Sequence, residues 1–332
     1  MPIGDDVTPE AAFEQIDALV SGAGFVPNAV SARIRAYQTA LDSPGPLCRH
    51  IASRLLTIPG AHVALFTGFV VPGAYPRGEN DGPLGTVALA RALAQAGWRP
   101  TIHVDPELLE TTRWLLAELR VSLPVLALSD KSRVRLDDVD IAIAIEKPGA
   151  NRVGVMHTFD GNRIEGGSKP VDRLFNELCG AEKITIGIGD LGNEVGFGTL
   201  RETVERLNPR ARTCSCGCGG GIASATVTEY LLPAAVSNWG AYGLTAALAL
   251  LVGGSEIPLR PEEEARMLRV AAVRGCCDGV RRHAGYGIDG HEGEISVRLV
   301  AELYELVRRC LDGEKSAPVR DPIERGNEAL RE

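Results

Sequence analysis

The stretch Lys183–Gly198, KITIGIGDLGNEVGFG, runs from a buried strand into a glycine-rich turn. Three isoleucines alternate with small residues in its first half, which is the pattern of a strand. Its glycines then turn the backbone sharply, and the turn carries Asp190, Asn193 and Glu194. Ligands of open α/β sheets bind at the carboxyl ends of strands. This turn is therefore predicted to form one half of a functional site, and residues 67–85 the other half.

Apolar strand-like segments alternate with amphipathic helical segments from residue 62 onward. Strands are predicted at 62–68, 99–104, 123–128, 140–145, in the opening stretch and at 228–236; helices are predicted at 84–96, 106–119, 171–179, 200–207, 241–252, 261–274 and 294–312. This order predicts an α/β fold with a Rossmann-like, doubly wound, mostly parallel sheet and right-handed crossovers. Residues 1–58 are expected to add an N-terminal helical layer to the same domain, residues 59–315 to form the α/β domain, and residues 316–332 to form a charged tail.

Composition indicates a globular protein with a mild acidic balance. Hydrophobic residues make up 45% of the chain, aromatic residues 5%, and the formal net charge is −8. Nucleic-acid binding is not expected, because it needs clustered Lys and Arg. The longest apolar run, Gly243–Gly254, is too short for a membrane span, and the first residues have no signal- or transit-peptide layout. Eight cysteines without even spacing favour a reduced compartment, so a cytoplasmic location is expected.

The loop after the first strand ends in Glu79-Asn80-Asp81-Gly82-Pro83-Leu84-Gly85. Asp81 precedes a helix, so it is either the N-cap of that helix or a site residue. Glu79 has no such capping role and is a candidate acid or base. Free amides at a helix N-terminus favour an anion, so the Gly82–Gly85 backbone is a candidate carboxylate or phosphate pocket.

Two further polar positions follow predicted strands. Glu146 ends an apolar strand, where it either belongs to the site or forms an ion pair with Lys147 or another base. Ser237 and Asn238 follow the sixth strand, where they either cap the next helix or add to an anion pocket. The helix after them, 241–252, is apolar enough either to pack internally or to form a homodimer.

The glycine-rich turn formally satisfies G-x-G-x-x-G from Gly187 to Gly192, which is a dinucleotide-binding pattern. Asp190 inside it would repel a pyrophosphate, and no strand ending in an acidic residue follows about 20 residues later. We therefore prefer Asp190, Asn193 and Glu194 as oxygen ligands for a hard divalent cation or an ammonium group.

Two later groups of residues are more ambiguous. Cys214-Ser-Cys216-Gly-Cys218 suggests a zinc or iron–sulfur site but lacks a second pair of ligands, so small loop thiols are preferred. Asp278 and Asp289 each precede a glycine and are interpreted first as turn residues, with a ligand role as the alternative.

Several of these segments together resemble the D-glutamate cyclase-like C-terminal domain family. They are Thr67-Gly68-Phe69, residues 79–85, Glu146-Lys147-Pro148-Gly149, Ile188–Gly196 and Val236–Ala241, and the late Asp278-Gly279 and Asp289-Gly290 are also similar. The blocks G-D-x-G-N-E-x-G and S-N-W-G are specific when they occur in this order. The resemblance covers about residues 60–300.

The resemblance implies a lyase-type cyclisation of D-glutamate to 5-oxo-D-proline with loss of water, and an acidic amino acid as the binding partner. A divalent cation, Mn²⁺ or Mg²⁺, would assist by polarising the γ-carboxylate. The expected catalytic residues are Glu79, Asp81, Asp190 and Glu194, with Asp190 and Glu194 also as metal ligands; the expected substrate-binding residues are Gly82, Gly85, Glu146, Asn193, Ser237 and Asn238. A binding module for a nucleotide or small acid and a dinucleotide-dependent oxidoreductase remain the alternatives.

Overall fold

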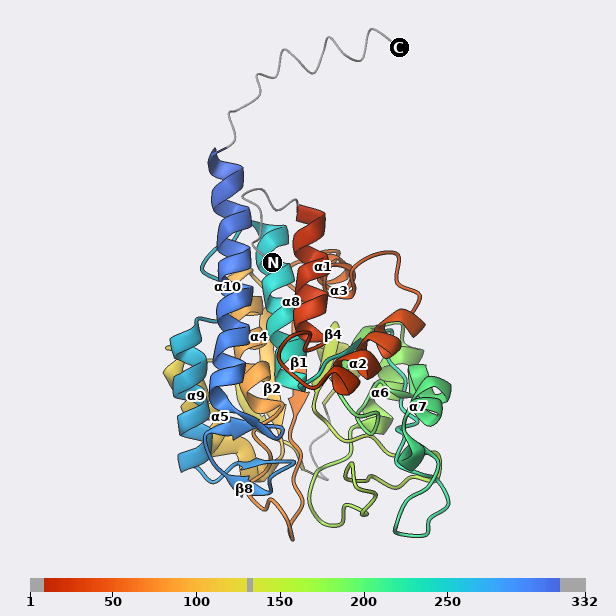
Figure 1. Cartoon of the computed structure of the whole chain (residues 1–332). Coiled ribbons are helices and arrows are strands. Elements are labelled where there is room, and N and C mark those ends of the chain that lie inside the picture. The colour runs from red at the N-terminus through yellow and green to blue at the C-terminus, as the bar shows by residue number, and fades with distance from the viewer. Residues whose placement is uncertain (1–8, 130–133, 317–332) are drawn as a thin grey trace, which may run out of the picture.

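The computed structural model describes residues 9–129 and 134–316 (Figure 1). Six strands in this part of the chain form one sheet in the order β3-β2-β1-β4-β5-β6, and all neighbouring pairs are parallel. The strands are β1 (His62–Thr67), β2 (Arg99–Val104), β3 (Val125–Ala127), β4 (Ile141–Ile145), β5 (Ile184–Gly189) and β6 (Tyr230–Pro233). The predicted doubly wound parallel sheet is confirmed.

Helices in the described residues cover both faces of this sheet (Figure 1). They are α1 (Pro9–Val20), α2 (Asn28–Ala40), α3 (Leu47–Leu55), α4 (Pro83–Gln95), α5 (Leu109–Glu118), α6 (Asp172–Gly180), α7 (Arg201–Leu207), α8 (Ser237–Val252), α9 (Pro261–Val273) and α10 (Gly293–Ser316). Successive strand residues point to opposite faces, so each strand contributes to two apolar layers. Val63 and Leu65 of β1 belong to the core shared with α4 and α8, whereas Phe66 packs against Phe175 of α6.

The predicted N-terminal helices form a layer outside α8. Helices α1 and α3 pack on α8, and α2 packs on β6 and α7. Tyr37 of α2 meets Phe197 edge to face, with 5.6 Å between the ring centroids. Because Phe197 belongs to the glycine-rich turn after β5, this layer also supports the turn.

Helix α8 packs internally. Figure 1 shows α10, α8 and α1 running side by side, and all three contact one another. Every residue of α8 from Ser237 to Ala249 is buried. Its hydrophobic character is thus explained by its central position. Within the described residues, no helix combines the length and apolar character that crossing a membrane requires.

Most boundaries differ from the sequence prediction by a few residues, and three differences affect the architecture. Strand β6 covers only Tyr230–Pro233, because the amide of Ala235 bonds to the carbonyl of Val20 in α1 instead of continuing in the sheet. The segment expected to hold only turns forms two small hairpins, from β7 (Cys277–Asp278), β8 (His283–Ala284), β9 (Gly287–Ile288) and β10 (His291–Glu292). Helix α10 continues to Ser316, and the rest of the predicted tail lies outside the described residues.

Candidate acidic active site

The strand order reverses between β1 and β4, which makes the carboxyl ends of these strands a topological switch point. Crevices at such points are where open α/β sheets bind ligands. The loops after β1, β4, β5 and β6 converge there. These loops and the first turns of α4 and α8 carry the site residues expected from the sequence. The fold therefore brings together residues that are more than 150 positions apart, such as Asp81 and Ser237.

A small cavity lies among these loops, with an empty volume of about 290 Å³ that includes its open mouth. We call it the acidic cavity. It is lined by Phe69, Tyr75, Glu79, Glu146, Phe159, Asp190, Leu191, Asn193, Gly279 and Asp289. Four of these residues are carboxylic acids, and three are aromatic. The lining therefore combines acidic and apolar side chains around a small space.

Two of the acids have a left-handed backbone conformation. Glu146 has a φ of 45° and Asp289 a φ of 47°. A non-glycine residue in this left-handed region costs of order 1–3 kcal/mol, and such strain clusters at functional sites. Glu146 directly follows the last residue of β4, and its side chain lines the cavity.

Asp190 and Asn193 present unpaired oxygens. Asp190 Oδ1 and Asn193 Oδ1 are buried and have no hydrogen-bond partner in the described part of the chain. The other end of the Asn193 side chain is anchored, because its Nδ2 donates to the carbonyl of His157 at 3.0 Å. A buried polar atom without a partner is costly, so these two oxygens mark a place where a ligand can bind.

Glu194 occupies the glycine-rich turn itself. Its carboxylate accepts hydrogen bonds from the amides of Leu191 at 3.1 Å and Gly192 at 2.8 Å, and a longer one from Asp190 at 3.4 Å. In a dinucleotide-binding turn these amides would face the pyrophosphate. Here the Glu194 carboxylate already accepts hydrogen bonds from these amides. The G-x-G-x-x-G pattern therefore no longer supports dinucleotide binding.

Asp81 and Asn238 cap each other's helices. The Asp81 carboxylate accepts from the amides of Ser237 at 2.9 Å and Asn238 at 2.8 Å, which open α8. The Asn238 side-chain oxygen accepts from the amides of Gly82 at 2.8 Å and Gly85 at 2.7 Å, which open α4.

This exchange corrects three expectations. Asp81 caps α8 and not the helix that follows it in sequence, and Asn238 likewise caps α4 across the site. The amides of Gly82 and Gly85, which were expected to hold an anionic group, are already paired within the protein. A local helix-start pattern cannot reveal this arrangement, because each cap comes from another segment.

Glu146 pairs with Ser237 and not with Lys147. The Ser237 hydroxyl donates to Glu146 Oε2 at 2.5 Å. Lys147 points to the other side of the strand, where its ammonium lies 2.7 Å from Asp105 Oδ2 and 3.2 Å from the carbonyl of Gly68. The Lys147–Asp105 pair is fully buried and ties the carboxyl ends of β1, β2 and β4 together.

Burial among like charges raises the pKa of the acids at this site. Loss of solvation is the largest cause in every case, and neighbouring carboxylates add to it at Glu79, Glu146 and Asp190, where the pKa lies well above its usual value. Burial raises the pKa of Asp81 to about 7 although three backbone amides oppose the shift, and it raises the pKa of Asp289 to about 8. Acids with such pKa values exchange protons near neutral pH, as general acid–base catalysis requires.

The residues fit a hard divalent cation. One oxygen each from Glu146, Asp190 and Glu194 lie within 4.8 Å of one another. Asp190 also carries an unpaired Oδ1, and carboxylate oxygens are the ligands that Mg²⁺ and Mn²⁺ prefer. The expected metal ligands Asp190 and Glu194 are thus adjacent, and Glu146 joins them.

The C-terminal hairpins supply a part of the site that the sequence did not assign. The amide of Asn80 donates to the carbonyl of Cys277 at 2.9 Å, and the Asn80 side chain donates to the carbonyl of Gly287 at 2.6 Å. This docking brings Asp289 into the wall of the acidic cavity. Asp278, by contrast, is the turn residue that was predicted, because it accepts from the amides of Val280, Arg281 and Gly290.

Sequence reasoning also missed the apolar wall. Phe69, Tyr75 and Phe159 line the cavity, and isolated aromatic residues in long loops give no periodic signal. Asp289 could have been found only from its position before a glycine, which it shares with Asp278.

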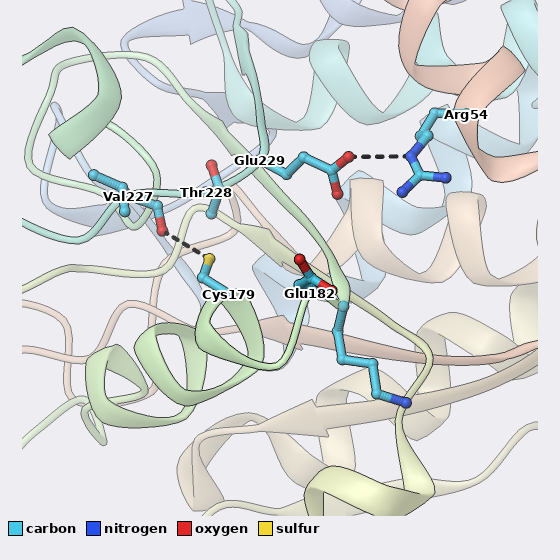
Figure 2. Close-up of a pocket in the computed structure, with 7 residues that line it drawn as sticks. Arg54, Cys179, Glu182, Val227, Thr228 and Glu229 are labelled. Atoms are coloured by element: carbon cyan, nitrogen blue, oxygen red, sulfur yellow. Dashed lines mark hydrogen bonds and ion pairs between the residues drawn. The ribbon is translucent and has the colours of Figure 1, made fainter.

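A second hollow lies at the opposite edge of the sheet, before β5 and β6 (Figure 2). It has an empty volume of about 730 Å³ that includes open solvent. Figure 2 shows Glu229 facing Arg54, with 3.1 Å between the two groups, and Cys179 facing the carbonyl of Val227. The charged pair is about one-third exposed and the acidic cluster is absent from this lining. The acidic cavity is therefore the better candidate for the active site.

The fold and the site define a parallel α/β protein with a buried carboxylate cluster at its topological switch point. A family model described as D-glutamate cyclase-like, C-terminal, matches residues 31–304, and the chain belongs to this family. The resemblance seen in the sequence is thereby confirmed. The chain is also 28% identical over 212 residues to D-glutamate cyclase, mitochondrial, of Homo sapiens. That match covers 57% of this chain and 33% of the human protein, so the chain matches about a third of the length of that relative.

Proposed function

We propose that this chain converts D-glutamate to 5-oxo-D-proline with loss of water, assisted by Mg²⁺ or Mn²⁺. The observation that carries the proposal is the acidic cavity with its unpaired Asp190 oxygen, in a chain of the D-glutamate cyclase-like family. The name of the human relative supplies the substrate and its chirality.

The charge of the cavity explains why a cation is included. The buried carboxylates of the protein attract the α-ammonium group of glutamate. They repel the two carboxylates of glutamate. A divalent cation held by Glu146, Asp190 and Glu194 would let a carboxylate of the substrate approach. When bound, the cation polarises the γ-carboxylate and stabilises charge on the departing oxygen.

Glu79 is the proposed acid and base. Its carboxyl group is buried beside the cavity, and burial together with Asp289 and Asp81 raises its pKa. The ring closes when the amine nitrogen bonds to the carbon of the γ-carboxylate and a C–O bond of that carboxylate breaks. Two protons leave the nitrogen and both end on the departing oxygen as water, so Glu79 accepts each proton as a base and returns it as an acid.

The remaining residues hold this constellation in place. Ser237 fixes Glu146 through its hydroxyl, and the Asp81–Asn238 exchange locks the loop after β1 against the start of α8. Asp81 and Asn238 are therefore proposed as positioning residues. Phe69 and Phe159 form an apolar wall that favours the folded conformer of the substrate and excludes water.

A dinucleotide-dependent oxidoreductase is the less favoured alternative. Its support was the G-x-G-x-x-G pattern, whose amides the Glu194 carboxylate already uses. A module that only binds a small acid would not need acids whose pKa values burial raises above their usual range.

The test is to incubate the purified chain with D-glutamate and Mn²⁺ or Mg²⁺ and to quantify 5-oxoproline by chromatography. We expect product with the wild type and a loss of at least about a hundredfold in Asp190→Asn. Asp137→Asn is the matched control, because this acid is exposed and does not line the cavity. The same assay with L-glutamate tests whether the reaction depends on the chirality of the substrate.

Two results would overturn the proposal. One is the absence of 5-oxoproline with either cation while the protein is folded, and the other is equal turnover by Asp190→Asn and the wild type. A thermal stabilisation by NAD that is independent of added metal would instead support the oxidoreductase.

A further inference from the structure

A second group of chemistry-bearing side chains lies outside the acidic cavity. Cys214, Cys216 and Cys218 are free thiols on the loop after α7. The sequence offered these three potential ligands without a fourth. The fold supplies it, because the ring of His157, which is 59 residues before Cys216, lies in direct contact with the thiols.

The distances within this group match a single metal ion. Cys214 Sγ lies 3.5 Å from Cys216 Sγ and 3.3 Å from Cys218 Sγ. His157 Nε2 lies 3.1 Å from Cys216 Sγ and 3.7 Å from Cys218 Sγ. Tetrahedral zinc with its usual bond lengths has S–S edges of about 3.8 Å and N–S edges of about 3.6 Å. These four distances differ from the ideal edges by at most about half an ångström, and the other two pairs of donors lie within 4.8 Å.

We propose that His157, Cys214, Cys216 and Cys218 form a structural zinc site. Three thiolates and one imidazole are a common structural zinc set, and four protein ligands leave no open position for catalysis. An iron–sulfur cluster would spread its ligands around several metal ions, whereas these four donors lie within 4.8 Å of one another. This proposal does not depend on the function of the acidic cavity.

The local backbone is shaped for such a site. In an extended strand, residues i and i+2 are about 6.6 Å apart, so C-x-C-x-C in a strand could not surround one point. Gly217, between Cys216 and Cys218, has a φ of 73°, and this left-handed turn brings the sulfurs together. Two N–H groups, Asn151 Nδ2 and the amide of Gly220, donate to Cys218 Sγ at 3.4 Å, as expected around a thiolate that binds a metal.

The site would join two long loops and brace the acidic cavity. His157 is fully buried, and its carbonyl accepts the hydrogen bond from Asn193 in the turn after β5. Phe159, two residues later, lines the cavity. A zinc ion here fixes the loop after β4 to the loop after α7, and thereby fixes one wall of the cavity.

The first test measures metal content. The full chain is purified with reduced thiols in the presence of zinc, passed through a desalting column, and analysed by mass spectrometry for zinc and iron. We expect about one zinc per chain in the wild type. The variant Cys216→Ser should not retain zinc. Because the Cys216 side chain is exposed, the substitution is not expected to prevent folding. Cys179→Ser is the matched control, because Cys179 is a partly exposed thiol that bonds to Thr185 instead.

The acidic cavity must be separated from this site. Asp190→Asn should retain the zinc, whereas zinc held by the carboxylates would be lost in that variant. A measurement without substitution uses a mercurial thiol reagent on the wild type, which should release one equivalent of zinc to a colorimetric chelator. Zinc below a tenth of an equivalent after reconstitution, iron in its place, an internal disulfide among the three cysteines, or wild-type zinc content in Cys216→Ser would each overturn the proposal.

Discussion

Replacing Lys147 with methionine is expected to lower the free energy of unfolding by about 3–5 kcal/mol. The Lys147 ammonium is 2.8 Å and 2.7 Å from the two carboxylate oxygens of Asp105, and both side chains are fully buried. Without the ammonium, the Asp105 carboxylate remains buried and keeps a hydrogen bond from the amide of Lys169 at 2.8 Å. Methionine preserves most of the aliphatic stem, so little of the loss comes from packing.

The double variant separates the cost of a broken pair from the value of the pair. Burial lowers the pKa of Lys147 although Asp105 opposes the shift, which indicates that desolvation offsets the attraction. The pair as a whole should then add little net stability. Lys147→Met combined with Asp105→Asn removes both charges of this pair and keeps an oxygen that can accept from the amide of Lys169. The double variant should therefore regain at least about 2 kcal/mol of the stability lost in Lys147→Met.

Urea unfolding followed by circular dichroism measures these changes. A loss of this size is a large part of the roughly 5–15 kcal/mol that stabilises an ordinary domain. Lys183→Met is the control, because its pair with Asp140 is partly exposed and its loss should cost at most about 1 kcal/mol. The reasoning is refuted if Lys147→Met lowers the free energy of unfolding no more than this control does. It is also refuted if the loss in the double variant equals the sum of the losses in Lys147→Met and Asp105→Asn measured singly.

Three further predictions concern the site and its support. Gly279→Ala should reduce turnover at least about tenfold with the fold retained, because its methyl group would lie 1.7 Å from Glu79 Oε1 and displace the proposed base; steady-state kinetics and circular dichroism check this. Asn238→Ala should cost about 1–3 kcal/mol, because the buried amide of Gly85 loses its acceptor whereas that of Gly82 keeps Asp81, and unchanged unfolding in urea would contradict it. Burial raises the pKa of Glu264 to about 7, so its protonated form favours the folded state and stability should fall as pH rises from about 4.5 to 7. This fall in the free energy of unfolding is at most about 3 kcal/mol and should lower the thermal unfolding midpoint over the same pH range. Glu264→Gln should flatten it, and the exposed Glu262→Gln should not.

Most of the fold was predictable from local patterns. Alternating isoleucines in β5 and the apolar run of β4 mark buried parallel strands, and parallel strands require right-handed crossovers. The short hairpins after α9 were not predicted, because two-residue strands carry no periodic signal. Their position depends on docking against the loop that carries Asn80.

The sequence predicted which acids lie near one another, but not which groups their side chains contact. Acids after successive parallel strands must meet at one edge of the sheet, which is why Glu79, Glu146 and Asp190 could be grouped in advance. Which group each of them contacts could not be read from the sequence. Glu146 was weighed against Lys147, its neighbour in sequence, yet its partner is Ser237.

The sequence by itself determined the class of fold, the edge of the sheet that carries the site and the acidic character of that site, because these follow from residue periodicity and strand direction. Only the tertiary structure decided that Asp81 and Asn238 exchange helix caps, that Asp289 enters the cavity, and that His157 joins the three cysteines. Each of these depends on contacts between segments far apart in the chain. Local patterns describe what a segment prefers to form, whereas the partners of its side chains are fixed only when the loops pack against one another.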